Sequence, residues 1–356
     1  MSVATDQTAA VRKGEELDLP KLESYLRGTL GVRDGSFSVE QFPGGHSNLT
    51  YLVKLGGREM VLRRPPFGSK VKSAHDMGRE HLILSKLSAV YPPAPKPLVF
   101  CEDESVIGAK FYAMERIQGV ILRQQRPAGF EASAAEVRRI CRGLAQNLAT
   151  LHAVDWRAIG LDSLQKKEGS FVQRQVEGWM RRWTESKTEE IPILDQSFAW
   201  CHKHIPADVG AVLIHNDYKF DNVILDPKDL ARVIGVLDWE MSTIGDPLFD
   251  LGVTLGYWMN PDEPMEMGSS SSFLTRMPGA ITRLEFAEAY AEKSGRDVSN
   301  MHWYYAFAIS KLAVVLQQIY YRYHHGLTKD ERFAGMNQGV MMLAQRSAQV
   351  IEKGSL

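Results

Sequence analysis

The chain has 356 residues, of which 44% are hydrophobic and 24% charged, with 42 Lys and Arg against 43 Asp and Glu. This length and balance are typical of a globular protein of about two domains. A net charge of −1 gives no basis for nucleic-acid binding. The most apolar stretch, residues 306–316, contains Lys311 and is too short to cross a bilayer, so no membrane partner is expected.

The first part of the chain predicts a hairpin with a glycine-rich tip. Residues 1–19 are expected to form a flexible tail, and a short helix is predicted over residues 21–29. Alternating residues predict strands over 37–42 and 49–53. Backbone N–H groups of the tip between them can approach a phosphate closely, although an ordinary β-turn is an alternative interpretation. The tip residues concerned are Gly44, Gly45 and Ser47.

A strand over residues 59–63 and a helix over 74–90 follow. Val61 and Arg63 share one face of the strand, where they can cover a purine ring and reach its phosphates. Glu80 lies on the apolar face of the helix, where a carboxylate is costly without a cation. We therefore predict an ion pair between Glu80 and Arg63, with a partly exposed Glu80 as the alternative.

The segment after the next strand is predicted to connect two lobes. Residues 110–117 leave the sheet in an extended conformation, so that the backbone near Met114, Glu115 and Ile117 can bind adenine. A plain linker would look similar. We expect the nucleotide-binding lobe to span residues 20–117.

Helical periodicity dominates residues 118–356, the predicted second lobe. Helices are predicted over residues 136–154, 171–183, 283–294, 302–324 and 330–353. The predicted fold class is α+β, with a two-lobed architecture: a small antiparallel sheet with one helix, then a mostly helical lobe. The cleft between the lobes is the expected binding site.

The most informative stretch of the sequence is His215-Asn216-Asp217-Tyr218-Lys219-Phe220-Asp221-Asn222. Its spacing, followed by a strand that ends at Asp238, is the catalytic pattern of protein-kinase-like phosphotransferases. Asp217 can orient a hydroxyl and accept its proton, and Asn222 and Asp238 offer oxygen ligands for Mg²⁺. A polar loop without chemistry is the alternative.

The strands around this stretch favour the catalytic interpretation. Residues 223–225 and 233–237 predict a hairpin with a turn over 226–229. That hairpin would bring Asn222 and Asp238 to the same end, where both can reach one ion.

These motifs together resemble the aminoglycoside and choline kinase-like family, and more narrowly its branch associated with acyl-CoA dehydrogenases. The resemblance covers roughly residues 20–345 and rests on the stretches Gly45-x-Ser47-Asn48, Met114-Glu115-Arg116, Leu151-His152-x-x-Asp155-Trp156, 215–222 and 238–251. It implies a two-lobed kinase fold that uses Mg-ATP, with Asp217 as catalytic base and Asn222 and Asp238 as metal ligands. It also implies that Asp250 braces the catalytic loop.

Two departures from the wider pattern matter for function. Arg63 stands where most of the family has Lys, and the planar guanidinium differs from a compact ammonium. The short stretch between Asp238 and Asp246 leaves no room for a regulatory activation segment. We therefore expect a small-molecule kinase, with a catalytically weak nucleotide-binding or scaffold protein as the alternative from another class.

The acceptor is expected to be a hydroxylated metabolite, a hydroxyacyl-CoA rather than an aminoglycoside. The resemblance implies acyl-CoA chemistry, and the segment 171–187 is rich in cations, which does not suit a polycationic substrate. Trp179 and Arg182 on this segment are the predicted acceptor contacts, with a solvated helix face as the alternative. Three widely spaced cysteines indicate free thiols and a cytoplasmic protein. No oligomeric state is predicted.

Overall fold

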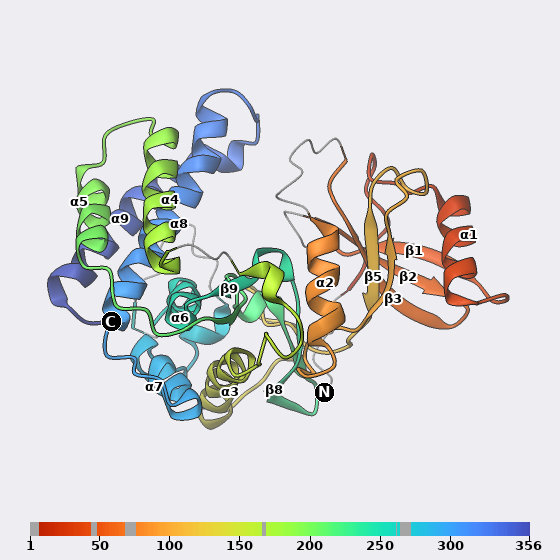
Figure 1. Ribbon diagram of the computed structural model, residues 1–356, viewed down its shortest axis with the longest axis horizontal. Coiled ribbons are helices and arrows are strands. Elements are labelled where there is room, and N and C mark those ends of the chain that lie inside the picture. The colour runs from red at the N-terminus through yellow and green to blue at the C-terminus, as the bar shows by residue number, and fades with distance from the viewer. Residues whose placement is uncertain (1–6, 44–47, 68–75, 166–168, 261, 264–271) are drawn as a thin grey trace.

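The computed structural model of the protein describes residues 7–43, 48–67, 76–165, 169–260, 262–263 and 272–356. Two lobes lie side by side, a sheet lobe that contains the N-terminal third and a helical lobe (Figure 1). The class predicted from the sequence, a two-lobed α+β fold with a small antiparallel sheet, is confirmed. The predicted glycine tip, with Gly44, Gly45 and Ser47, lies outside the described residues.

The sheet lobe consists of five antiparallel strands in the order β1-β2-β3-β5-β4. Helix α1 lies on the outer face of the sheet, and α2 lies between the sheet and the helical lobe (Figure 1). Asp18 and Asp76 cap these two helices with their side chains. The elements are α1 Leu19–Leu30, β1 Phe37–Gln41, β2 Leu49–Leu55, β3 Arg58–Arg64, α2 Met77–Leu87, β4 Pro97–Cys101 and β5 Phe111–Glu115.

The segment before α1 differs from the expected flexible tail over the residues that the structure describes. Ala9 forms a bridge with Gln41 of β1 through two backbone hydrogen bonds of 2.8 and 2.9 Å. The Tyr51 hydroxyl donates to the Glu15 carbonyl at 2.7 Å, and Leu17 is buried. The polar composition of this segment gave no sign of packing, because its contacts are mostly hydrogen bonds to the edge of the sheet.

The helical lobe carries a hairpin and a small two-stranded ladder among its helices. Its helices are α3 Ala134–His152, α4 Phe171–Ser186, α5 Pro192–Lys203, α6 Pro247–Gly256, α7 Arg283–Ser294, α8 Met301–His324 and α9 Met336–Lys353. Its strands are β6 Val212–Ile214, β7 Val223–Asp226, β8 Asp229–Val236 and β9 Thr243–Gly245. Short 3-10 turns include Phe220–Asn222, Trp239–Met241, Phe273–Arg276 and Glu331–Phe333. One prediction was wrong in detail: the helix expected over 330–353 is interrupted before Gly335.

The two lobes share a hydrophobic core. One buried cluster fills the space between the sheet and α1, and a second continues from α2 through the whole helical lobe. The crossing chain lies tightly against the hairpin, since a Cβ on Gly119 would come within 2.5 Å of Ile224 and of the Leu225 carbonyl. Val120 then exchanges backbone hydrogen bonds with Leu225. The connection between the lobes is thus anchored to the β7–β8 hairpin, which also carries site residues.

Candidate active site

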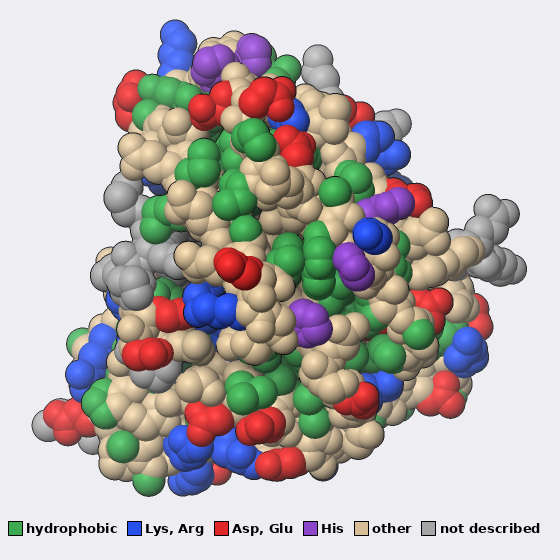
Figure 2. All heavy atoms as spheres, turned by 90° about the vertical axis from the view of Figure 1, so that its left-hand side faces the viewer, with side chains coloured by type: hydrophobic (Ala, Val, Ile, Leu, Met, Phe, Trp, Pro, Cys, Tyr) green, Lys and Arg blue, Asp and Glu red, His purple; other side chains and the backbone are tan. Residues whose placement is uncertain are grey.

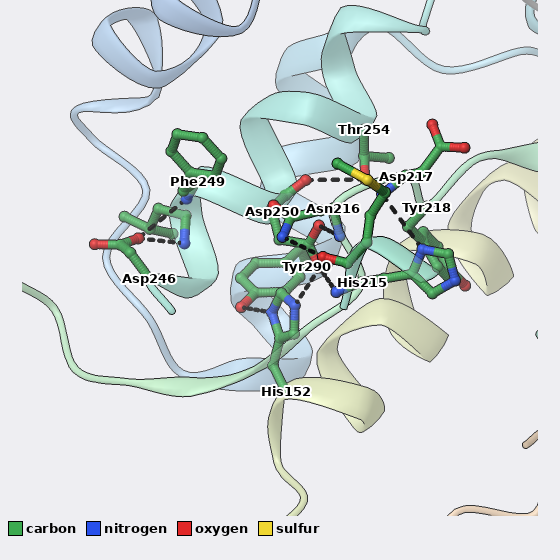
Figure 3. A network of polar contacts seen from close by, with 12 residues as sticks. His152, His215, Asn216, Asp217, Tyr218, Asp246, Phe249, Asp250, Thr254 and Tyr290 are labelled. Atoms are coloured by element: carbon green, nitrogen blue, oxygen red, sulfur yellow. Dashed lines mark hydrogen bonds and ion pairs between the residues drawn. The ribbon is translucent and has the colours of Figure 1, made fainter. Parts of the chain in front are cut away.

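The loop 215–222 is held from below by the buried carboxylate of Asp250 on α6 (Figure 3). Its Oδ2 accepts the His215 amide at 2.7 Å and its Oδ1 accepts the Asn216 amide at 2.6 Å. This is the bracing of the catalytic loop that the family resemblance implied for Asp250. Two backbone donors that would otherwise be buried without partners are satisfied by one side chain.

His152 supports the same carboxylate from α3. Its Nε2 lies 3.1 Å from Oδ2 of Asp250, and its Nδ1 lies 2.8 Å from the Tyr290 hydroxyl (Figure 3). Burial opposes ionisation of Asp250, but the His152 hydrogen bond, the charges of His152 and His215 and the His215 amide lower its pKa below the ordinary value. The loop is therefore braced by a carboxylate that stays charged.

The Asp217 carboxylate is fixed by hydrogen-bond donors. The Lys219 ammonium lies 2.8 Å from Oδ1, and the Asn222 amide nitrogen lies 2.8 Å from Oδ2. The Tyr257 hydroxyl also hydrogen-bonds to Asp217. Because 22% of the Asp217 side chain stays exposed, a substrate hydroxyl can still approach it. The arrangement orients a carboxylate beside a cation, as a proton acceptor in phosphoryl transfer requires.

The β7–β8 hairpin brings Asn222 and Asp238 to one end, as predicted. Val223 pairs with Val236, and one step further the Leu237 amide donates to the Asn222 carbonyl at 2.8 Å. Asp238 then turns into the left-handed region, with φ 66° and ψ 61°, an uncommon conformation for a residue with a Cβ. Such strain, on the order of 1 kcal/mol, is typical of functional sites.

Arg63 on β3 joins Glu80 to Asp238. Its guanidinium lies 3.1 Å from Glu80 and 2.8 Å from Asp238. The predicted Arg63–Glu80 pair is therefore present, and the bond to Asp238 is an addition that the sequence analysis did not include. Burial disfavours the guanidinium charge, but the two carboxylates raise the pKa of Arg63 well above its ordinary value. Burial also opposes the Asp238 charge, and Arg63 outweighs it, so the pKa of Asp238 is lowered.

The segment that carries Asp238 is bound to the sheet lobe at further points. The Trp239 amide donates to Glu80 at 3.2 Å, and Asn48 donates to Glu240 at 2.7 Å. The Arg79 guanidinium donates to the Ser242 carbonyl. The two lobes are thus connected by hydrogen bonds at the place where the site residues of both lobes meet.

The residues predicted to bind adenine surround the connection between the lobes. Val61 is partly buried on β3 and Met114 is buried on β5, while Glu115 is exposed. The Glu115 amide donates to the Lys96 carbonyl, and the Glu115 carboxylate accepts the Lys96 amide. Ile117 lies against the hairpin, since its Cδ1 would be 3.2 Å from a Cβ on Gly235.

The predicted acceptor contacts lie on α4. Trp179 is buried, with 8% exposed, and the Arg182 guanidinium lies 4.7 Å from the centre of its ring. Trp183 on the same helix belongs to the core, and its indole N–H donates to Asp195 of α5 at 2.8 Å. Of the aromatic residues on this helix, Trp179 is therefore the one that meets Arg182.

Three further residues near the site were not singled out as functional by the sequence analysis. Lys219 and Tyr257 both contact Asp217, and the Lys219 ammonium lies 4.2 Å from the centre of the Tyr257 ring. Lys311 on α8 is buried close to the same carboxylate. Lys219 had a signal in the sequence, because it lies only two residues after Asp217 within the same motif. Tyr257 and Lys311 are distant in sequence from residue 217 and had none.

The fold and this constellation define a phosphotransferase of the kinase-like type. Residues 38–299 match the phosphotransferase enzyme family, and the chain belongs to that family. Mouse acyl-CoA dehydrogenase family member 10 is 35% identical over 325 residues, which is 90% of this chain and 30% of that protein. Mouse acyl-CoA dehydrogenase family member 11 is 35% identical over 357 residues, 98% of this chain and 45% of that protein. The chain thus spans less than half the length of these relatives.

Solved structures agree with the family. A Ralstonia eutropha protein assigned by name to the aminoglycoside phosphotransferases is 30% identical, with a TM-score of 0.80 over 95% of this chain and 99% of that chain. A choline kinase from Cryptosporidium parvum has 12% identity and a TM-score of 0.63, over 95% of this chain and 97% of its own. A mutant of aminoglycoside phosphotransferase APH(4)-Ia in complex with AMP-PNP and hygromycin B has 15% identity and a TM-score of 0.58. The match covers 93% of this chain and 98% of that chain. The last two likenesses show the fold alone. Among the described residues, no helix is long and apolar enough to cross a membrane.

Proposed function

We propose that this protein transfers the γ-phosphoryl group of ATP, in the presence of Mg²⁺, to a hydroxyl group of a small molecule. The observation that carries the proposal is the meeting of Asp217, Asn222 and Asp238 beside the Arg63–Glu80 pair. Phosphoryl transfer needs positioning and charge stabilisation more than covalent chemistry. A carboxylate for the hydroxyl, oxygen ligands for a metal and a cation for the phosphates are the groups that it needs.

The nucleotide is proposed to lie between the lobes. In this arrangement Val61 and Ile117 cover the purine, and Met114 closes the back of its pocket. The backbone from Glu115 to Ile117 contacts its edge. Gly44, Gly45 and Ser47 are proposed to bind the phosphates, and Arg63, held by Glu80, reaches them from the strand. The same arrangement supports a boundary at residues 117 and 118 between a nucleotide lobe from residue 20 and a catalytic lobe that continues to residue 356.

The donor atoms of Asn222 and Asp238 suit Mg²⁺. The Asn222 amide nitrogen is used by Asp217, which leaves its oxygen for a cation, and one carboxylate oxygen of Asp238 is not engaged by Arg63. A carboxylate and an amide oxygen are hard ligands of the kind that Mg²⁺ binds together with substrate phosphates. When bound, the ion neutralises charge on the β- and γ-phosphate oxygens.

Asp217 is proposed as the base. The acceptor oxygen attacks the γ-phosphorus while its proton passes to the Asp217 carboxylate, and the bond to the β–γ bridging oxygen breaks to leave ADP. Asn222 and Tyr257 hold Asp217 in place, and Lys219 sits where an ammonium can stabilise negative charge on the transferring group.

For the acceptor we propose a hydroxyacyl-CoA, bound on the α4 side at Trp179 and Arg182. The named relatives support acyl-CoA chemistry. On the outer face of the helical lobe, away from the sheet lobe, acidic and basic side chains are interspersed (Figure 2). A polycationic aminoglycoside would call for clustered carboxylates. Free, buried Cys101, Cys141 and Cys201 support a reducing, cytoplasmic setting.

The test is acceptor-dependent release of ADP from Mg-ATP with hydroxybutyryl-CoA, kanamycin and choline as separate acceptors. We expect stimulation and a phosphorylated product with hydroxybutyryl-CoA. Turnover of kanamycin alone would overturn the acceptor and favour an aminoglycoside phosphotransferase. ATP binding without stimulation by any hydroxyl compound would favour the second candidate, a weakly catalytic nucleotide-binding scaffold. The Arg63–Asp238 bond is the observation behind that candidate, because it engages a proposed metal ligand.

A further inference from the structure

Lys311 is a buried cation near the middle of α8 that has no anionic partner among the described residues. It is 7% exposed, and its ammonium lies 5.5 Å from the ring centres of Trp179 and Phe249. Within the described part of the chain, no carboxylate lies at ion-pair distance from it. Cation–π contacts at this distance offset only a part of the cost of burying an ammonium group. A buried, unpaired lysine needs an explanation other than fold stability.

The charged groups around Lys311 include the carboxylate of the proposed base. The charged groups that act on its ammonium are the carboxylates of Asp217 and Asp250 and the cations of Arg182 and Lys219. Burial is the largest influence and lowers the pKa of Lys311 to about 8. Lys311 therefore lies in the same charged surroundings as the proposed base, on the side of the site away from the nucleotide lobe.

A second cation meets Lys311 on the same aromatic ring. The exposed Arg182 guanidinium lies 4.7 Å from the Trp179 ring centre. Other cations of α4 and its C-terminal end are paired: Arg181 lies 3.9 Å from Glu185, and Lys187 lies 3.0 Å from Glu190. For Arg182, in contrast, no carboxylate of the described residues lies at ion-pair distance. Two cations thus lie near one indole ring, and neither has a carboxylate of the described residues at ion-pair distance.

We propose that Lys311 and Arg182, with Trp179 between them, form a subsite for an anionic oxygen group of the acceptor, a carboxylate or a phosphate. The proposal rests on the proposed transfer to a small-molecule hydroxyl and adds which chemical group selects the acceptor. An anion there would neutralise the buried ammonium and be held by the guanidinium at the entrance. It would also fix the acceptor so that its hydroxyl faces Asp217.

Two variants and one matched control test this subsite. Lys311→Met keeps the side-chain length and removes the charge, and Arg182→Gln changes an exposed position that does not threaten folding. We expect each variant to raise KM for hydroxybutyryl-CoA about tenfold or more, with KM for ATP unchanged, because each variant loses a charge-assisted contact with the acceptor. Arg181→Gln, one residue away and paired with Glu185, should leave both constants unchanged.

The source of the anion is separated by comparing acceptors. If the group is a phosphate of coenzyme A, the wild type should prefer hydroxybutyryl-CoA over hydroxybutyryl-pantetheine, and Lys311→Met should lose that preference. If the group is a carboxylate, free hydroxybutyrate should be the acceptor whose KM depends on Lys311. A KM that changes in neither variant with either acceptor would overturn the subsite.

A calorimetric titration without nucleotide distinguishes this proposal from the proposed function. Binding of coenzyme A or hydroxybutyrate to the wild type, weakened tenfold in Lys311→Met and Arg182→Gln, would support the subsite even if no hydroxyl were phosphorylated. Turnover of an acceptor with equal binding to wild type and variants would leave the phosphotransferase activity intact and reject the subsite.

Discussion

Asp250 and Lys311 are both buried charged residues on neighbouring helices of the same lobe, but the groups that surround them differ. Asp250 accepts hydrogen bonds from two backbone amides and contacts His152. Lys311 has aromatic neighbours and no acid at ion-pair distance among the described residues. The pKa of each is lowered, but for a carboxylate this favours the charged form and for an ammonium it disfavours it.

This contrast distinguishes a structural charge, whose partners lie within the protein, from a charge in a binding site, whose partner is supplied by a ligand. A buried charge with all its partners inside the protein fixes a loop and needs nothing from a ligand. A buried charge without partners costs stability unless a ligand supplies one. We therefore expect substitutions on the Asp250 side to damage folding or catalysis, and substitutions on the Lys311 side to affect acceptor binding while sparing the fold.

The largest effect is expected at the loop that Asp250 holds. Asp217→Asn keeps the shape of the side chain and removes the proton acceptor, so kcat should fall by roughly 10²–10⁴. The measurement is steady-state turnover with the acceptor that the wild type uses. Calorimetric ATP binding should stay nearly unchanged, and near-normal kcat would show that Asp217 is not the base.

Asp250→Asn should be the most destabilising of the conservative changes. An amide in place of the carboxylate leaves a buried backbone donor facing another donor, which we expect to lower the free energy of unfolding by about 3 kcal/mol. Asp155→Asn is the matched control, because Asp155 also accepts two backbone amides but is exposed. Equal losses in urea unfolding of the two variants would mean that burial of Asp250 contributes nothing.

The assignment of Asp238 as a metal ligand predicts an effect of similar size on stability, which is seen only when Mg-ATP is bound. Mg-ATP at about 100 times its Kd should stabilise the wild type by about 2.7 kcal/mol, since a ligand bound only to the native state raises Tm. In Asp238→Ala, Mg²⁺ should add nothing to the thermal shift given by ATP alone. Identical shifts with Mg-ATP in both proteins would remove Asp238 from the metal site.

Arg63 and Glu80 should be coupled by about 0.5–3 kcal/mol in kcat/KM for ATP, since they form one contact. The measurement is a double-mutant cycle with Arg63→Ala, Glu80→Ala and the double variant. Strict additivity would mean that the pair has no joint role. Arg63→Lys sharpens the result: retained or improved activity would show that a point charge is enough.

The smallest expected effect is a change in the free energy of unfolding when the Lys311 charge is removed. In contrast to Asp250→Asn, this substitution should stabilise the protein. The folded pKa of about 8 lies below the unfolded lysine value, so the unfolded state binds more protons between these values. The free-energy cost of burying the Lys311 charge is full below about pH 8 and diminishes as the pH rises toward about 10.5. Lys311→Met should thus be more stable than wild type by roughly 1–3 kcal/mol at pH 7.

The gain in Lys311→Met should become smaller at pH 10 when both proteins are unfolded thermally. The groups that bias this titration are Asp217, Asp250, Arg182 and Lys219. A constant difference from pH 7 to pH 10 would mean that Lys311 has the same pKa in the folded and the unfolded protein, so that burial does not disfavour its charge and the contrast with Asp250 does not hold.

Much of the site could be predicted from patterns of residues that lie close together in the sequence. The hairpin that joins Asn222 to Asp238 was predicted because strand periodicity and a turn are local properties, and its register is set by neighbouring residues. The Arg63–Glu80 pair was predicted because an acid on an apolar helix face requires a cation. The packing of the N-terminal segment was not predicted, since its hydrogen bonds to β1 depend on a partner about thirty residues away in the sequence.

The sequence by itself determined the family, the two-lobed class and the residue types of the phosphoryl-transfer site, because these depend on spacing and periodicity along the chain. Only the tertiary structure decided which distant side chains complete it. Tyr257 reaches Asp217 from the end of α6, and Lys311 meets Trp179 across the α4–α8 contact. No sequence pattern marks such partners, because they become neighbours only when hydrophobic burial packs the helices together.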